Sequence, residues 1–151
     1  MNIIRILHQS ATNTEHMKIL AIDFGEKRIG FAMGNTELGI SLPLKPFRKI
    51  KPGPEIEHIK ILITEYDIEK IVLGYPLNMD GSESQFSKRI KNFKKKLAYE
   101  IDIDIELLDE RLTSFEAEEM LKSFKKQFKK RREIIDSIAA MIILNEFMEI
   151  R

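Results

Sequence analysis

The chain has 151 residues, of which 43% are hydrophobic and 32% are charged, and its formal net charge is +1. This length and balance predict one domain with its own core and exclude a disordered chain. The absence of cysteine excludes a disulfide scaffold, a thiol nucleophile and a cysteine-ligated zinc site. The three histidines show no metal-ligand spacing, and no apolar run is long enough to span a membrane. We therefore expect a cytoplasmic protein with no membrane partner.

Residues 1–16 differ in composition from the rest of the chain, because a short apolar patch is followed by a run of polar residues. This stretch makes a poor secretory signal. We predict that residues 1–16 form a loosely ordered N-terminal extension and that residues 17–151 form the domain.

The first half of the domain is predicted to contain four strands and one helix. Residues 18–23 and 29–34 form two strands joined by a tight glycine-containing turn, as in a hairpin. An irregular extended stretch with two prolines follows at 40–48. A helix opens at Pro54, since proline is tolerated in the first helical turn. Residues 71–74 are then typical of a short strand that is buried on both faces.

The second half alternates helices with a strand. Ser82 and Gln85 predict a capping box that opens a helix, whose apolar stripe comprises Phe86, Ile90, Phe93 and Leu97. Residues 101–107 alternate apolar and acidic side chains, as expected for a half-exposed strand, which ends at Leu108-Asp109-Glu110. A second capping box, from Thr113 to Glu116, starts another helix. The last helix, residues 133–148, is apolar on most sides and is predicted to lie against the sheet.

The predicted order is three strands, a helix, a strand, a helix, a strand and two helices. A hairpin followed by alternating helices and strands predicts an α/β fold, in which a mixed five-stranded sheet carries helices on both faces. No glycine or proline interrupts residues 113–132, so the segment before the last helix is predicted to be short or partly helical.

Three acidic side chains stand where separate elements end or begin. Asp23 ends the first strand, Glu110 follows a later strand, and Asp136 lies in the apolar opening of the last helix. Each has an ordinary structural explanation: a turn former, an acid near a helix N-terminus, and a paired or exposed carboxylate, respectively. If the three converge, they form an oxygen-only site suited to Mg²⁺ or Mn²⁺. Two such ions about 4 Å apart would stabilise both the attacking and the leaving oxygen of an in-line displacement.

Basic residues cluster in two regions although the whole chain is almost neutral. One cluster spans residues 88–96, and the other, which contains no acid, runs from Lys122 to Arg132. The second cluster is either a solvated helix face or a surface that holds a polyanion. Phe124 and Phe128 interrupt it at helical spacing, which favours packing over base stacking. Because the cluster leads directly to Asp136, it would hold a nucleic-acid backbone through salt-dependent contacts that do not read the base sequence.

Four motifs, spread along residues 17–151, together resemble those of the bacterial YqgF-type family. Members of this family are described as candidate Holliday junction resolvases and pre-16S ribosomal RNA nucleases. Any one motif is weak evidence, whereas all four in the same order are strong evidence. The motifs are Asp23-Phe24-Gly25-Glu26-Lys27-Arg28-Ile29-Gly30, Gly74-Tyr75-Pro76-Leu77-Asn78-Met79-Asp80-Gly81, Asp109-Glu110-Arg111-Leu112-Thr113-Ser114 and Ile135-Asp136-Ser137-Ile138-Ala139-Ala140.

The resemblance implies a ribonuclease H-like fold and divalent-metal-dependent hydrolysis of phosphodiester bonds, with two Mg²⁺ or Mn²⁺ ions. It implies that Asp23, Glu110 and Asp136 are the catalytic and metal-binding acids, with Asp23 bridging the metals. Family members are associated with two substrates, branched DNA junctions and the 5′ end of precursor 16S ribosomal RNA. We favour the RNA, which implies a role in ribosome biogenesis and makes the ribosome a candidate partner. Resolution of Holliday junctions in recombination and repair is the alternative.

Eight further residues are candidates for holding the nucleic acid. Lys27 and Arg28 either face phosphates or lie in a solvated turn. Asn78 either donates to a phosphate or holds its own loop, while Arg111 either orients a phosphate or pairs with Asp109. The basic cluster contributes the remaining four: Lys129, Lys130, Arg131 and Arg132.

Two other classes of function compete with a nuclease. An ATP-binding protein related to actin and sugar kinases would need two such domains and a second phosphate loop, whereas this chain has one domain. A catalytically silent nucleic-acid-binding module is the other class, and the presence of all three acids argues against it. The oligomeric state stays open, because a symmetric junction resolvase favours a two-fold homodimer whereas an RNA-trimming enzyme can act as a monomer.

Overall fold

A computed structural model describes residues 16–49, 54–112 and 115–150 of the chain. The predicted extension, apart from its last residue, and the Thr113 cap of the second capping box lie outside the described residues.

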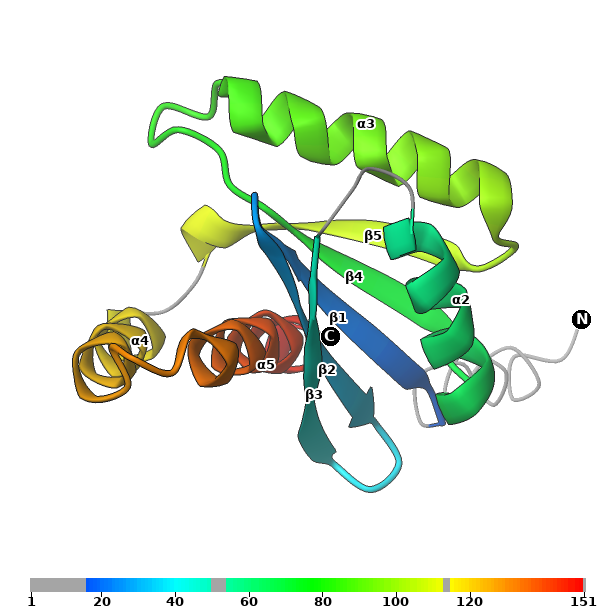
Figure 1. The fold of residues 1–151 in the computed structure, drawn as a ribbon, viewed down its shortest axis with the longest axis horizontal. Coiled ribbons are helices and arrows are strands. Elements are labelled where there is room, and N and C mark those ends of the chain that lie inside the picture. Colours follow the sequence, from blue (N-terminus) through cyan, green and yellow to red (C-terminus); the bar gives the residue numbers. More distant parts are fainter. Residues whose placement is uncertain (1–15, 50–53, 113–114, 151) are drawn as a thin grey trace, which may run out of the picture.

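Five strands form one mixed sheet in the spatial order β3-β2-β1-β4-β5 (Figure 1). The antiparallel part consists of β1 (Lys18–Phe24), β2 (Arg28–Asn35) and β3 (Ile40–Arg48). β4 (Lys70–Tyr75) lies parallel to β1, and β5 (Asp104–Asp109) lies parallel to β4. The predicted five-stranded mixed sheet is therefore confirmed.

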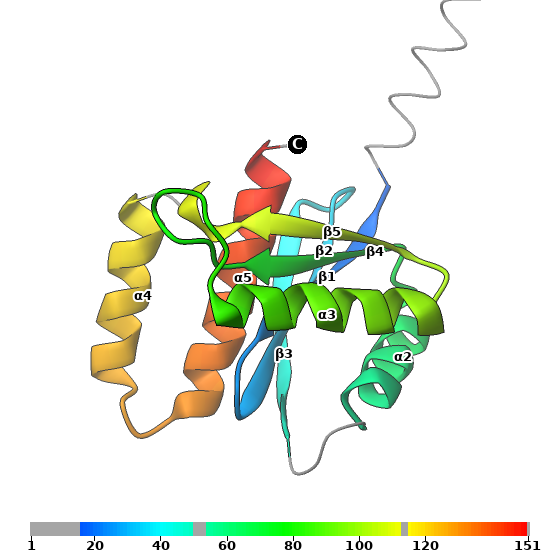
Figure 2. The same cartoon turned by 90° about the horizontal axis from the view of Figure 1, so that it is seen from above.

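Helices cover both faces of this sheet (Figure 2). α2 (Pro54–Tyr66) and α3 (Gln85–Glu100) pack on one face. α5 (Arg132–Ile150) crosses the other face and contacts β1 to β4, while α4 (Phe115–Gln127) packs beside α5. The α/β class with helices on both faces is confirmed. None of the helices in the described part of the chain is long and apolar enough to span a membrane.

The alternation of side chains along β1 supplies both halves of the core. Leu20 and Ile22 pack into the cluster under α2 and α3, whereas Ile19 and Ala21 pack into the cluster under α5. Ala21 and Ala32 of the sheet and Ala140 of α5 are fully buried. These small side chains let the α5 backbone lie close to the sheet, which brings the start of α5 to the end of β1.

The capping box predicted at Ser82 is wrong, because Ser84 is the N-cap of α3 and accepts a hydrogen bond from the backbone N–H of Ser87. Ser82 belongs to the preceding loop, where its hydroxyl donates to Asp80 at 2.6 Å. The strand predicted to start at residue 101 begins instead at Asp104, because α3 continues to Glu100 before the chain turns, and it ends at Asp109, within the predicted end.

The segment before the last helix is partly helical, as predicted. α4 ends at Gln127, and a short turn over residues 128–130 leads toward α5. Phe124 and Phe128 pack on each other with ring centroids 5.8 Å apart, which supports packing over base stacking. Lys129, Lys130 and Arg131 therefore project from a bend between two helices rather than from one continuous helix face.

Candidate active site

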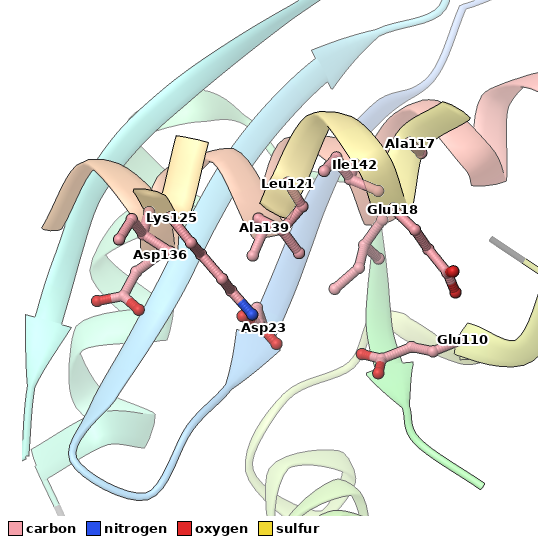
Figure 3. A pocket seen from close by; sticks show the side chains of 11 residues that line it. Asp23, Glu110, Ala117, Glu118, Leu121, Lys125, Asp136, Ala139 and Ile142 are labelled. Atoms are coloured by element: carbon pink, nitrogen blue, oxygen red, sulfur yellow. The ribbon is translucent and has the colours of Figure 1, made fainter. Parts of the chain in front are cut away.

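The three predicted acids line one pocket at the edge of the sheet where the parallel strands end. Asp23 is the penultimate residue of β1, and Glu110 directly follows β5. Asp136 reaches the same edge from the second turn of α5. All three line a pocket of about 370 Å³, and Figure 3 shows Asp23 between the other two. The topology thus brings together residues that are far apart in sequence.

Two glycines keep space free around these acids. Gly30 is the partner of Asp23 in the hairpin, and a Cβ atom at this position would collide with the backbone carbonyl oxygen of Asp136. A Cβ atom on Gly74 would lie 2.5 Å from Oε1 of Glu110. Gly30 therefore lets α5 approach β2, and Gly74 leaves room for the Glu110 side chain between β4 and α5.

Burial and repulsion between the acids raise the pKa values of two of them. Burial, followed by the charge of Asp136, raises the pKa of Asp23 to about 6, and Lys125 partly offsets this effect. Burial, followed by the charges of Asp23 and Asp109, raises the pKa of Glu110 to about 7. Carboxylates that repel one another in a buried pocket favour either a shared proton or a bound cation.

Two basic side chains face the acids from opposite sides. Lys125 extends from α4 so that its ammonium group reaches toward the carboxylate of Asp23 (Figure 3). Arg28, the first residue of β2, donates from Nε to Oδ2 of Asp136 at 2.6 Å. The Arg28–Asp136 pair is mostly buried, with side-chain exposures of 24% and 19%.

The acids fit Mg²⁺ or Mn²⁺ in the chemistry of their donors. All three are carboxylates in one pocket, and the pKa values of Asp23 and Glu110 are raised first by burial and then by neighbouring negative charge, which a hard cation would neutralise. Within the described ranges, however, no three histidine or acidic side chains converge closely enough to hold an ion. The pocket therefore supplies suitable ligands in an open arrangement.

A second, basic pocket of about 600 Å³ has Arg28 in its wall. It lies where the end of β3 meets the bend between α4 and α5. Glu133 is the acidic residue in this wall. Its basic lining residues are Arg28, Arg48, Lys129, Lys130, Arg131 and Arg132. Five of these six were predicted as nucleic-acid contacts, and the structure brings all five together.

The other three predicted contacts lie elsewhere. Asn78 holds its own loop, since its side-chain amide donates to Oγ of Ser82 at 3.0 Å. Arg111 pairs with Asp109, with Nη2 and Oδ2 2.7 Å apart. Lys27 is exposed and lines neither pocket. In the structure Asn78 therefore holds its own loop and Arg111 pairs with Asp109, which were the alternatives to contact with a phosphate.

The sequence interpretation assigned no role to Arg48 or Glu118, and it placed Lys125 only in the basic cluster that would hold a nucleic acid. All three line the two pockets, and Lys125 lies beside the acids. Arg48 pairs with Arg28 only because the β2–β3 register shifts between Ile29 and Phe31. A regular register would have paired Arg28 with Phe47, so the sequence carries no signal for Arg48. Glu118 and Lys125 lie seven residues apart on α4, and this spacing puts both on one helix face.

A family model described as "RuvX: Holliday junction resolvase" matches residues 17–150. The chain belongs to the RuvX family. This confirms the predicted resemblance, because YqgF-type proteins are members of this family. It also favours the nuclease over the ATP-binding class.

Named relatives agree with this membership. A protein of Natranaerobius thermophilus is 36% identical over 88% of this chain and 94% of its own length, and one of Chloroflexus aggregans is 37% identical over the same shares. Both carry the name "Putative pre-16S rRNA nuclease".

Two solved structures share the fold at low sequence identity. RuvC of T. thermophilus, in complex with a Holliday junction substrate, has a TM-score of 0.55 at 10% identity and covers 89% of this chain and 96% of its own. The fowlpox virus Holliday junction resolvase has a TM-score of 0.53 at 13% identity, covering 89% of this chain and 100% of its own. The ribonuclease H-like fold is confirmed, and RuvX membership identifies the chain as a phosphodiester-hydrolysing nuclease.

Proposed function

We propose that this chain is a divalent-metal-dependent nuclease that processes the 5′ end of precursor 16S ribosomal RNA. One observation carries the proposal: a pocket lined by four carboxylates, three of them the proposed ligands, adjoins a pocket lined by six basic side chains, and Arg28 and Asp136 join the two pockets. A nuclease that uses metal ions needs both environments, because acids hold the ions while bases hold the phosphate backbone.

Asp23, Glu110 and Asp136 are the proposed metal ligands, and two ions, Mg²⁺ or Mn²⁺, are the proposed cofactors. When bound, such ions polarise the scissile phosphate and activate the attacking water. Asp23 lies between the other two acids (Figure 3), which suits a bridging role. Lys125, which faces Asp23, is placed to offset the negative charge of the pocket in the free protein.

The basic pocket is the proposed site for the backbone of the nucleic acid. Lys129, Lys130 and Arg131 project from the bend between α4 and α5, and Arg48 faces them from the end of β3. Such contacts hold phosphates without reading bases. Recognition of a particular RNA end would then depend on its shape or on a partner, for which the ribosome is the proposed candidate.

The names of the relatives favour RNA as the substrate. Resolution of Holliday junctions is the second candidate function, since the RuvC structure contains a Holliday junction substrate and the fowlpox virus protein is described as a resolvase. A symmetric resolvase would act as a homodimer on two strands, whereas trimming of one RNA end requires only a monomer.

The experiment compares cleavage of a labelled 5′ fragment of precursor 16S RNA with cleavage of a labelled four-way DNA junction. Each substrate is incubated with Mg²⁺, Mn²⁺ or EDTA. We expect metal-dependent cutting of the RNA, reduced at least about a thousandfold in Asp23→Asn because the central ligand is lost. The matched control is Glu118→Gln, which removes an acid of the same pocket that is not a proposed ligand.

If the chain cut only the junction, its function would be Holliday junction resolution. A dimer would then be expected in size-exclusion chromatography. Equal losses in Asp23→Asn and Glu118→Gln would contradict the assignment of Asp23 as a ligand. Binding of both substrates without cutting of either would identify a silent binding module.

A further inference from the structure

Arg28 belongs to two sites at once. Its guanidinium group holds Oδ2 of Asp136, which lines the carboxylate pocket, while the same side chain lines the basic pocket. The bond connects residues that are 108 positions apart in the sequence. This ion pair therefore joins a proposed metal ligand to the proposed phosphate site.

The pair opposes metal binding in the free protein. A carboxylate that accepts a short, charge-assisted hydrogen bond has one oxygen engaged, and its negative charge is neutralised by the guanidinium group. In agreement, the acids of the described chain do not close into a three-ligand cluster. Oδ1 of Asp136 can still ligate an ion, but release from Arg28 would make both oxygens and the full negative charge available to it.

A phosphate in the basic pocket would compete for Arg28. Arg48 stands opposite Arg28 in the β2–β3 ladder, and Lys129 to Arg132 form the facing wall. These basic side chains attract a polyanion into the pocket, and arginine presents several N–H donors that suit phosphate as well as carboxylate. The backbone thus brings to Arg28 a partner that replaces Asp136.

We propose that a backbone phosphate docked in the basic pocket draws Arg28 away from Asp136 and thereby frees Asp136 to bind the divalent ion. Arg28 is then a positioning residue that makes metal and nucleic acid bind cooperatively. The proposal rests on the proposed nuclease function, since it assigns a phosphate-bearing ligand to one pocket and a metal to the other. Because binding linkage is reciprocal, each ligand raises the affinity for the other by the same factor.

The test measures Mn²⁺ binding by electron paramagnetic resonance, with and without a short single-stranded RNA, after subtracting the Mn²⁺ that the RNA binds alone. For the wild-type chain we expect RNA to tighten Mn²⁺ binding about fivefold or more, within the usual range of coupling between sites. In Arg28→Gln we expect tighter Mn²⁺ binding without RNA and no further gain when RNA is added.

Arg48→Gln is the matched control, because it removes one positive charge from the same pocket at the residue that pairs in register with Arg28. We expect it to weaken RNA binding to a similar extent as Arg28→Gln while the fivefold coupling persists. Independent binding of RNA and Mn²⁺ to the wild-type chain would overturn the proposal. Undiminished coupling in Arg28→Gln would do the same.

A second variant keeps the proposal testable if Arg28→Gln fails to fold. Asp136→Asn frees Arg28 from the other side, so RNA binding in EDTA should tighten more than in Glu133→Gln, which also removes an acid beside the basic pocket. Equal tightening in the two variants would show a simple charge effect and would overturn the proposal. None of these readouts requires cleavage, so a chain that couples the two ligands but cuts neither substrate would contradict the nuclease function alone.

Discussion

At the scale of single residues, ionisation of Asp23 and Glu110 lowers the stability of the folded protein. Their pKa values, about 6 and about 7, lie above the ordinary values of 3.8 and 4.5. Between the ordinary and the raised pKa, the folded chain binds more protons than the unfolded chain, so the free energy of unfolding contributed by these groups falls as pH rises. A cation bound in the pocket would offset this loss of stability, because it would neutralise the ionised carboxylates.

We therefore predict that Asp23→Asn stabilises the metal-free protein, and more so as pH rises from about 4 to above 6, because the amide has no charge to desolvate. The gain above pH 6 should be on the order of 1–2 kcal/mol relative to acidic pH. Thermal unfolding in EDTA across this range measures it. Asp102→Asn, at an exposed position, is the control and should show little change. A gain for Asp23→Asn that does not vary with pH would contradict the raised pKa.

At the scale of elements, the site depends on how closely α5 approaches β2. Gly30 meets the backbone of α5 at Asp136, and Gly34, on the same strand, meets the flexible side chain of Leu144, whose Cδ2 would lie 2.9 Å from an added Cβ. Ser137 also ties α5 to β3, since its hydroxyl donates to the carbonyl oxygen of Leu44 at 2.9 Å. The position of Asp136 therefore follows from the packing of a whole helix.

We predict that Gly30→Ala lowers both stability and activity, because a backbone carbonyl cannot move aside as a side chain can. The loss of stability should be about 1–3 kcal/mol, typical of overpacking, and the displaced α5 should carry Asp136 out of the pocket. Gly34→Ala is the matched control, because the added Cβ meets a side chain, that of Leu144, instead of a backbone carbonyl. Chemical denaturation and cleavage rates, compared at equal folded fraction, measure the two effects. Full specific activity in folded Gly30→Ala would show that the site tolerates movement of α5.

The elements were predictable because their hydrophobic patterns are local, whereas several contacts of the site are not. The apolar runs of β1 and β4, and the alternation of apolar and acidic residues that ends in β5, predicted these strands. The helix cap was misplaced because serine at either 82 or 84 can cap a helix, and the contacts of Ser82 with Asp80 and Asn78, which hold it in the loop, are not visible in the sequence. The Arg28–Asp136 pair depends on the placement of α5, which no local pattern encodes.

At the scale of the whole molecule, a net charge of +1 conceals a separation of charge. The acids that line the sheet edge lie beside a basic pocket built from β2, β3 and the bend between α4 and α5. The other basic cluster, residues 88–96, belongs to α3 on the opposite face of the sheet (Figure 1). The basic pocket is joined to the acids through Arg28 and Asp136, whereas the α3 cluster reaches this edge of the sheet through Arg89, which pairs with Glu26 in the β1–β2 turn.

We predict that Lys129→Gln and Lys130→Gln each lower the slope of log affinity against log salt by about 0.7 for a single-stranded RNA, because each removes one phosphate contact. Lys95→Gln and Lys96→Gln on α3 are the controls, since both side chains are exposed and α3 packs on the opposite face from α5. Fluorescence anisotropy in EDTA over a range of salt concentrations measures the slopes without cleavage. If the α3 variants lower the slope as much as the others, RNA is held diffusely over the surface. If only Lys129→Gln and Lys130→Gln lower the slope, the RNA backbone binds in the basic pocket that Arg28 also lines.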